Sequence, residues 1–235
     1  GAIQMKSFLQ GLPELRVGLN EDLSVGKGGS AVSYGINVDD CNFHECVQLD
    51  EFERDRTLVL KPPDGEFTLM RYRIAGNTRQ ALPFKTVLTY EDGGGIGRTD
   101  VIVRLDCEIP EKSMGTDVTV KIPLPKFTTS CAYELGAAGQ TLKYDKDDKV
   151  ATWTMSKVTG GLSYYCKLKL MVPEDQLRNV SSDVGAVSLT FEVPMYVCSG
   201  INIRYLRVTE RGKNYVPFRW VRYITHSDSY VFRMQ

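Results

Sequence analysis

A two-residue alternation of apolar and polar side chains runs through most of this sequence, and it limits the possible folds more than any other feature. Neighbouring side chains of a strand point to opposite faces, so the alternation predicts strands with one buried face. Turn signals separate these stretches, as at Pro62-Pro63-Asp64-Gly65. Proline presets φ there and glycine accepts positive φ. The alternating stretches are residues 2–9, 14–19, 56–62, 66–74, 100–109, 117–125, 150–155, 164–172, 187–193 and 201–208. Many strands with regular turns predict an all-β, immunoglobulin-like β-sandwich.

Helical periodicity is scarce. Only residues 50–56 (DEFERDR) have the composition of a short helical turn. Residues 170–185 are predicted to be a strand that runs into a longer loop. The Gly/Ser-rich stretch 26–35 is predicted to be a loop.

Two changes of composition divide the chain, one in the polar stretch 75–83 and one at 198–200. They fit a subdomain of residues 77–197 that is inserted into an outer subdomain of residues 1–76 and 198–235. The alternation alone does not establish the insertion.

Composition excludes several classes of protein. Lys+Arg and Asp+Glu are equal at 29 each, which argues against a general polyanion binder. The six cysteines are scattered, so we expect reduced, mostly buried thiols rather than a disulfide framework. No apolar run approaches the roughly 18 residues of a membrane span. The first residues show no signal-peptide pattern. They begin within a strand-like stretch, which indicates a piece of a longer chain.

Three stretches resemble chemical sites but lack a necessary part. The Gly-rich residues 91–100 precede a strand, whereas a phosphate loop needs a helix N-terminus. They are predicted to be a hairpin turn. Cys41, His44 and Cys46 have no second ligand pair downstream, so no metal site is expected. His226, Ser227 and Asp228 are adjacent in sequence, and adjacent strand residues diverge, so a catalytic triad is not expected. Ser227 or Asp228 is expected to satisfy backbone donors instead. No enzyme activity and no cofactor are predicted.

The C-terminal stretch FRWVRYI (residues 218–224) suggests a binding function. In a strand, Trp220 and Arg222 share one face and Val221 lies on the other. An indole and a guanidinium side by side form a surface for an aromatic guest, and the guanidinium can hold a phenol hydroxyl. The alternative is a core tryptophan beside an ordinary surface arginine.

Several ordered blocks resemble the C-terminal domain of adaptor-complex medium (mu) subunits. They are MKSFLQGLPELRVGLN (5–20), FHECVQLDEFERDR (43–56), PPDGEFTLMRYR (62–73), LPF (82–84), CSGINIRYLRV (198–208) and WVRYI (220–224). The likeness covers essentially the whole chain. VQLDEFE and HSDSYVFR look most like the medium subunit of the fourth adaptor complex.

The resemblance implies an elongated all-β domain of two sandwich-like parts, the second inserted in the first, without catalysis. Its implied function is the recognition of tyrosine-based sorting signals in cytosolic tails of membrane cargo. Such a signal has a tyrosine and, three residues later, a bulky apolar residue. The peptide lies extended along a strand edge, in the strand-addition mode of recognition.

The resemblance also assigns residues. The tyrosine pocket would use Lys6, Trp220 and Arg222. The apolar pocket would use Ile203, Leu206 and Val221, with Arg219 at its flank. Family members have an earlier strand that adds a phenylalanine and an aspartate to the tyrosine pocket, and this strand is absent from the sequence. A second signal surface would use Phe43 and Arg71, with the arginine pairing an acidic residue of the signal.

The implied partners are cargo tails and the other subunits of an adaptor complex, without nucleic acid. The implied location is cytoplasmic, peripheral on trans-Golgi or endosomal membranes through the complex. The alternative is a scaffold domain for coat assembly that binds no tyrosine signal.

Overall fold

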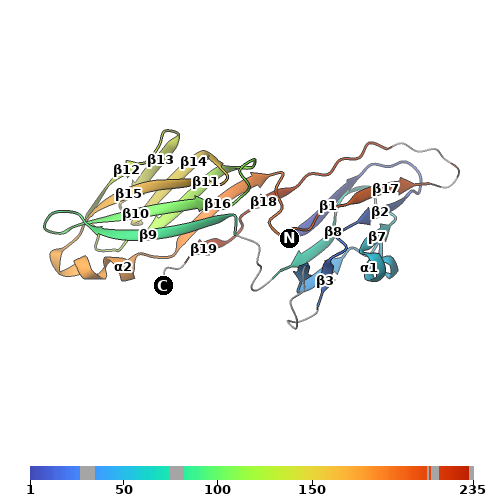
Figure 1. The fold of residues 1–235 in the computed structure, drawn as a ribbon, viewed down its shortest axis with the longest axis horizontal. Helices are drawn as coiled ribbons and strands as arrows, with labels where there is room; N and C mark the ends of the chain where they lie inside the picture. Colours follow the sequence, from blue (N-terminus) through green and yellow to red (C-terminus); the bar gives the residue numbers. More distant parts are fainter. Residues whose placement is uncertain (27–34, 75–81, 211, 213–216, 233–235) are drawn as a thin grey trace. The chain divides into compact units, whose positions relative to one another are not determined.

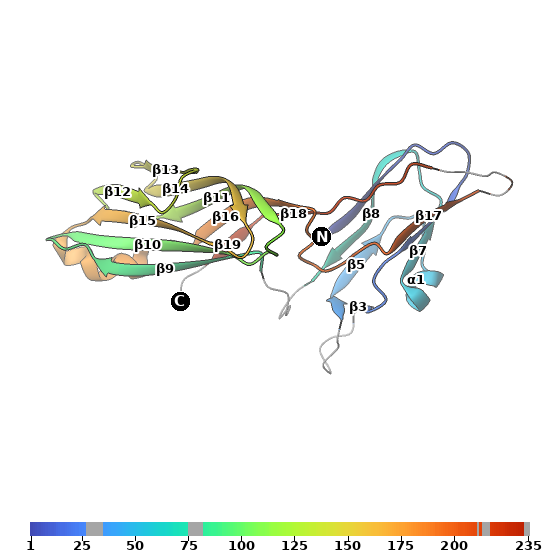
Figure 2. The same cartoon turned by 45° about the horizontal axis from the view of Figure 1, so that its top comes forward.

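The computed structural model describes residues 1–26, 35–74, 82–210, 212 and 217–232, which form two compact units (Figures 1 and 2). The first unit is drawn from the described parts of 1–80 and 199–222, and the second from those of 81–198 and 223–235. Antiparallel strands dominate both units, which confirms the mostly-β prediction. The expected loop at 26–35 and the junction at 75–83 fall largely outside the described residues.

The first unit has two main sheets around one core. The four-stranded sheet has the order β17-β2-β7-β6 and the three-stranded sheet the order β1-β8-β5, while β3 and β4 form a small parallel pair. The bounds are β1 (Ala2–Ser7), β2 (Glu14–Gly18), β3 (Leu23–Val25), β4 (Ile36–Val38), β5 (Asp40–Phe43), β6 (Val47–Gln48), β7 (Thr57–Leu60), β8 (Gly65–Arg73) and β17 (Tyr205–Thr209). Inward residues from both sheets, including Val17, Leu58 and Met70, fill the core.

The short helix predicted at 50–56 is present as α1 (Asp50–Asp55). It packs against β7 and buries Phe52 in the core of the first unit. Arg16 of β2 holds the helix by a two-pronged bond to Glu51, at 2.9 and 2.6 Å. The helix ends at Arg56, which takes a left-handed conformation (φ 60°).

The second unit is a sandwich of a four-stranded sheet, order β12-β15-β10-β9, and a sheet of order β13-β14-β11-β16-β18, with β19 also on β16. The strands are β9 (Phe84–Asp92), β10 (Arg98–Cys107), β11 (Met114–Pro123), β12 (Ser130–Leu135), β13 (Gln140–Asp145), β14 (Val150–Thr159), β15 (Ser163–Met171), β16 (Val187–Pro194), β18 (Ile224–His226) and β19 (Tyr230–Phe232). The glycine-rich residues 91–100 form the β9–β10 hairpin, as predicted.

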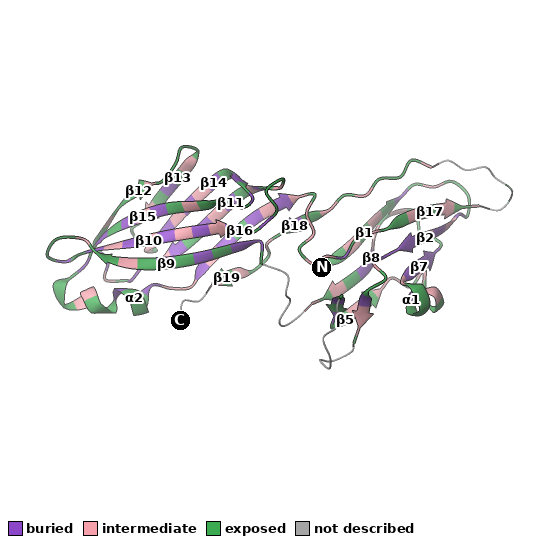
Figure 3. Cartoon of the chain, viewed as in Figure 1, coloured by how far each residue is buried: buried purple, intermediate pink, exposed green. Residues whose placement is uncertain are grey.

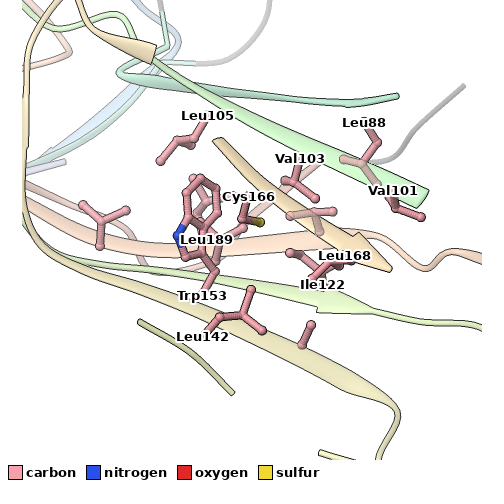
Figure 4. Close-up of a cluster of buried hydrophobic side chains, with 14 of the residues drawn as sticks. Leu88, Val101, Val103, Leu105, Ile122, Leu142, Trp153, Cys166, Leu168 and Leu189 are labelled. Atoms are coloured by element: carbon pink, nitrogen blue, oxygen red, sulfur yellow. The ribbon is translucent and has the colours of Figure 1, made fainter. Parts of the chain in front are cut away.

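Alternation decides which side chains fill this sandwich. Buried and more exposed residues alternate along β10 and β14 (Figure 3). Trp153 of β14 is fully buried among side chains of both sheets, including Val103 and Ile122 (Figure 4). Its indole N–H donates to Oε1 of Gln140 at 3.1 Å, so its polar atom is satisfied.

The C-terminal strands belong to the second unit rather than to the outer part in which residues 198–235 were placed. Strand β18 pairs with β16 from Ile224↔Pro194 to His226↔Glu192, and β19 pairs with the other half of β16. The chain therefore enters the second unit twice. Sequence alternation does not reveal which strand is the pairing partner.

Residues 170–185 also differ from the predicted strand and loop. After β15 they contain η1 (Glu174–Asn179) and α2 (Val180–Asp183). Val180 anchors this segment in the core of the second unit. Leu177 and Val184 pack against the same core, but the two turns are too short for this spacing to stand out from the strand and loop around them.

All six cysteines lie in the described residues, and none forms a disulfide. Cys107 and Cys166 are buried, Cys198 is exposed and the other three are half-buried, so the thiols are less buried than expected. Burial raises the pKa of Cys107 to about 11 and that of Cys166 to about 12.

Candidate peptide-binding site

Strand β17 forms one wall of the candidate site. Leu206 and Val208 pack against the core of the first unit, whereas Tyr205 and Arg207 are exposed, as the alternation predicts. The strand lies at the end of its sheet and pairs with β2. No strand among the described residues pairs with its other side. An end strand offers backbone groups to an added strand.

Tyr205 fixes this wall to its sheet. It lies opposite Gly18, and a Cβ on Gly18 would approach its ring to 2.3 Å, so only glycine admits the ring here. The Tyr205 hydroxyl lies 2.8 Å from Oγ1 of Thr57, one strand further across the sheet. The ring therefore spans three strands, and it leans away from the free side of β17.

The second wall is the segment 217–223, which lies outside every strand, although its alternation predicted one. Pairing begins only at Ile224, where β16 supplies a partner. Phe218 is 95% exposed and Trp220 69% exposed, while Val221 is half-buried. The alternative that Trp220 is a core residue is wrong. In both ribbon views this segment passes beside β1 (Figures 1 and 2).

The two walls border a shallow, open hollow of about 350 Å³. It is lined by Ile203, Arg204, Tyr205, Leu206, Arg219, Trp220 and Val221. All four residues assigned to the apolar pocket are among them, together with Trp220. Nη1 of Arg219 donates to the carbonyl oxygen of Leu206 at 2.6 Å, which ties the two walls together.

The sequence analysis missed two lining residues, Arg204 and Tyr205. Both stand in the block that carries Ile203 and Leu206, so their position in INIRYLRV was the available signal. Arg204 is ion-paired with Glu21, and its guanidinium lies 5.8 Å from the centre of the Tyr205 ring. Its charge is therefore compensated within the protein.

The structure does not bring the three assigned tyrosine-pocket residues into this hollow together, since only Trp220 lines it. Lys6 extends from β1, with its Nζ 3.9 Å from a carboxylate oxygen of Glu66 and 5.5 Å from the centre of the Phe8 ring. Arg222 is exposed two residues after Trp220.

The two residues of the second signal surface lie on neighbouring strands but not on one face. Arg71 of β8 is opposite Asn42 of β5, and Phe43 is opposite the buried Met70. Side chains alternate along a strand, so Arg71 points outward and Phe43 points toward the core. Phe43 packs edge-on against Phe52, with the ring centres 4.8 Å apart.

The remaining candidate motifs have local partners. Nδ1 of His44 lies 3.1 Å from Sγ of Cys46, and among the described residues no three His, Cys, Asp or Glu side chains converge as metal ligands. Ser227 Oγ accepts from the Phe191 amide at 3.0 Å, as expected for a residue that satisfies backbone donors. No helix of the described part has the length and apolar character of a bilayer span.

Comparison with known sequences identifies relatives across the whole chain. It is 40% identical over 243 residues to the AP-4 complex subunit mu of Arabidopsis thaliana and 36% identical over 244 residues to AP-4 complex subunit mu-1 of Homo sapiens. It is 30% identical over 233 residues to AP-1 complex subunit mu-2 of Rattus norvegicus, with 99% of the chain covered. The two AP-4 matches cover 100% of the chain, and all three cover 53% of the relative, so the chain spans about half the length of these relatives.

Solved structures share the fold at low sequence identity. The Fcho1 mu homology domain of Danio rerio with a bound Eps15 peptide aligns with a TM-score of 0.60 at 13% identity, over 94% of this chain and 78% of that one. The yeast delta-COP-I mu-homology domain complexed with a Dsl1 WxWxV peptide aligns with a TM-score of 0.56 at 11% identity, over 82% and 73%. Residues 1–234 match the family of adaptor complexes medium subunits, which are coat components without enzyme activity. The chain thus belongs to the adaptor complexes medium subunit family, as its sequence blocks predicted.

Proposed function

We propose that this chain is the cargo-recognition domain of a vesicle coat adaptor and that it binds tyrosine-based sorting signals. The observation that supports this most is the hollow between β17 and residues 219–221. It brings Ile203, Leu206 and Val221 together from two segments of the chain, with Trp220, which is 69% exposed, in its lining. An exposed tryptophan in a hollow that combines apolar side chains with a few polar groups is an arrangement typical of binding sites.

The apolar residue of the signal enters the hollow and contacts Leu206 and Val221. Burial of one such side chain contributes about 1.5–3 kcal/mol. The signal's tyrosine, three residues earlier, stacks on Trp220, and its hydroxyl accepts from Arg222. Aromatic stacking adds about 0.5–1.5 kcal/mol. Backbone bonds along the free side of β17 hold the peptide extended without sequence preference.

Two solved structures of this fold hold peptides, from Eps15 in one and from Dsl1 in the other. They support the use of the fold for peptide recognition, and the signal class proposed for this chain rests on its own hollow. The adaptor partners are the other subunits of an AP-4-like complex. The site of action is the cytosolic face of trans-Golgi or endosomal membranes, reached through that complex.

A peptide titration tests the proposal. A fluorescent peptide with the pattern Tyr-x-x-Leu is titrated with the purified domain, beside versions with Tyr→Ala or Leu→Ala. We expect micromolar binding, which corresponds to about −8 kcal/mol, and a loss of at least about tenfold for either alanine peptide. Indistinguishable curves for the three peptides would refute the proposal.

Protein variants locate the site. Trp220→Ala is expected to weaken binding about tenfold. Its control is Phe218→Ala, because Phe218 lies in the same segment, is 95% exposed and does not line the hollow. Arg71→Ala tests the second surface, and we expect it to leave binding unchanged. A domain that recovers coat subunits from extracts but binds no signal peptide would be the alternative scaffold.

A further inference from the structure

The wall formed by residues 217–223 has little burial to hold it in place. Its side chains Phe218 and Trp220 are 95% and 69% exposed, and the segment belongs to no strand. Yet Val221 of this segment and Leu206 of β17 line the same hollow. The width of the hollow therefore depends on contacts that join the two walls.

The bond from Nη1 of Arg219 to the Leu206 carbonyl oxygen, 2.6 Å long, is such a contact, and we call it the clasp. A charged donor to a carbonyl is stronger than a neutral hydrogen bond. The described residues show no ion pair between Arg219 and a carboxylate within 4.0 Å. The Leu206 carbonyl oxygen is thus a specific partner of this guanidinium in the described structure.

We infer that Arg219 is a positioning residue that preforms the hollow. The clasp holds residues 219–221 at a fixed separation from β17, so a peptide does not have to order this wall when it binds. Preorganisation of this kind lowers the entropic cost of association. The effect on peptides rests on the proposed function, whereas the ordering of the wall does not.

The arginine chemistry fits this role. The rigid planar fork directs one N–H at the Leu206 oxygen, and the residue is otherwise exposed. A lysine at this position offers a flexible point charge and would hold the carbonyl less well. Arg207 provides a matched control, because it is an exposed arginine of β17 that does not line the hollow.

The first test uses the protein without ligand. Hydrogen exchange, read by mass spectrometry on peptides that cover residues 217–222, is compared for wild type, Arg219→Ala and Arg207→Ala. We expect exchange in this segment to accelerate about fivefold in Arg219→Ala, the factor for loss of one hydrogen bond. Arg207→Ala should match the wild type. Equal exchange in Arg219→Ala and wild type would overturn the inference.

The second test uses signal peptides whose anchor residue is Leu or Ala. The ratio of their affinities reports how well the hollow is formed, and a merely structural role elsewhere would not change it. We expect Arg219→Ala to reduce the ratio about fivefold, Arg219→Lys to restore part of it, and Arg207→Ala to leave it intact. An unchanged ratio, or tighter binding by Arg219→Ala, would show that the clasp does not preform the site.

These outcomes separate the two proposals. If the wild type binds none of the peptides, the proposed function fails, and the exchange experiment still decides the role of the clasp. If the wild type binds and discriminates but Arg219→Ala does so equally well, the function stands and the positioning role fails.

Discussion

The close approach of Tyr205 to Gly18 predicts that Gly18→Ala lowers the stability of the first unit when Tyr205 is present and raises it when Tyr205 is replaced by alanine. In Gly18→Ala, the new methyl would lie 2.3 Å from the Tyr205 ring, so the ring must leave its place. Its hydroxyl then leaves Thr57, whose side chain is 99% buried (relative exposure 1%). A buried hydroxyl that loses its partner costs about 1–3 kcal/mol. Replacing a strand glycine with alanine returns about 0.5–1 kcal/mol, so we expect a net loss of up to about 2.5 kcal/mol.

The background Tyr205→Ala removes the collision and the hydroxyl together. There, Gly18→Ala should stabilise the first unit by about 0.5–1 kcal/mol, because only the strand preference of alanine remains. The assay is hydrogen exchange in increasing urea on peptides from β2 and β7, which report the first unit. With the other tryptophan removed by Trp220→Phe in every variant, fluorescence of Trp153 reports the second unit as an internal reference. Additive effects of the two substitutions in this double-mutant cycle would show that the ring and Gly18 are not coupled.

Three further predictions concern the second unit. Trp153→Ala should lower its stability by about 3–5 kcal/mol, read as a lower calorimetric midpoint, because it empties the centre of the sandwich; a loss under about 1 kcal/mol would contradict that packing. Burial raises the pKa of Tyr230 to about 12, and its hydroxyl donates to the Phe84 carbonyl at 2.8 Å. The unfolded tyrosine titrates near 10, so the stability that Tyr230 contributes is complete below pH 10 and is lost between about pH 10 and 12, by up to about 2–3 kcal/mol. The urea midpoint should therefore fall less between pH 9 and pH 11 in Tyr230→Phe than in wild type. An equal fall in the two proteins would refute this role of Tyr230. Because burial raises the pKa of Cys107 to about 11 and of Cys166 to about 12, iodoacetamide at pH 8 should label neither until urea unfolds the protein, which peptide mapping can show.

The strands that could be predicted are those in which one face is buried. The alternation of β10 and β14 is long, and the sandwich buries its apolar half, so local pattern and tertiary structure agree. The β9–β10 hairpin follows from its glycines. The segment 217–223 alternates like a strand, but a strand also needs a partner to pair with. β16 pairs with the C-terminal segment only from Ile224 onward, so the alternation alone predicted a strand that is not formed.

In the candidate site, too, some residues could be predicted from the sequence and others could not. Ile203, Leu206 and Val221 could be placed together because family resemblance carries tertiary information that the alternation lacks. Phe43 and Arg71 could not be assigned to one face, since that depends on the register of β5 against β8. The clasp is a contact between a side chain and a backbone carbonyl, and no sequence pattern encodes the backbone partner.

Each unit is built from two separate stretches of the chain, and this has a consequence for biosynthesis. β2 cannot pair with β17 until the ribosome has synthesised the chain from residue 18 to residue 205. In the same way, β16 cannot complete its pairing until the strands that end at Phe232 have been synthesised. At usual elongation rates, the first of these delays lasts about 10–40 s on the ribosome. Meanwhile one edge of β2 is unpaired, and the core of the first unit lacks Ile201, Leu206 and Val208. Holdase chaperones are therefore expected to bind the nascent protein, and a stop codon before β17 should yield a polypeptide that is degraded or aggregates rather than a smaller folded domain.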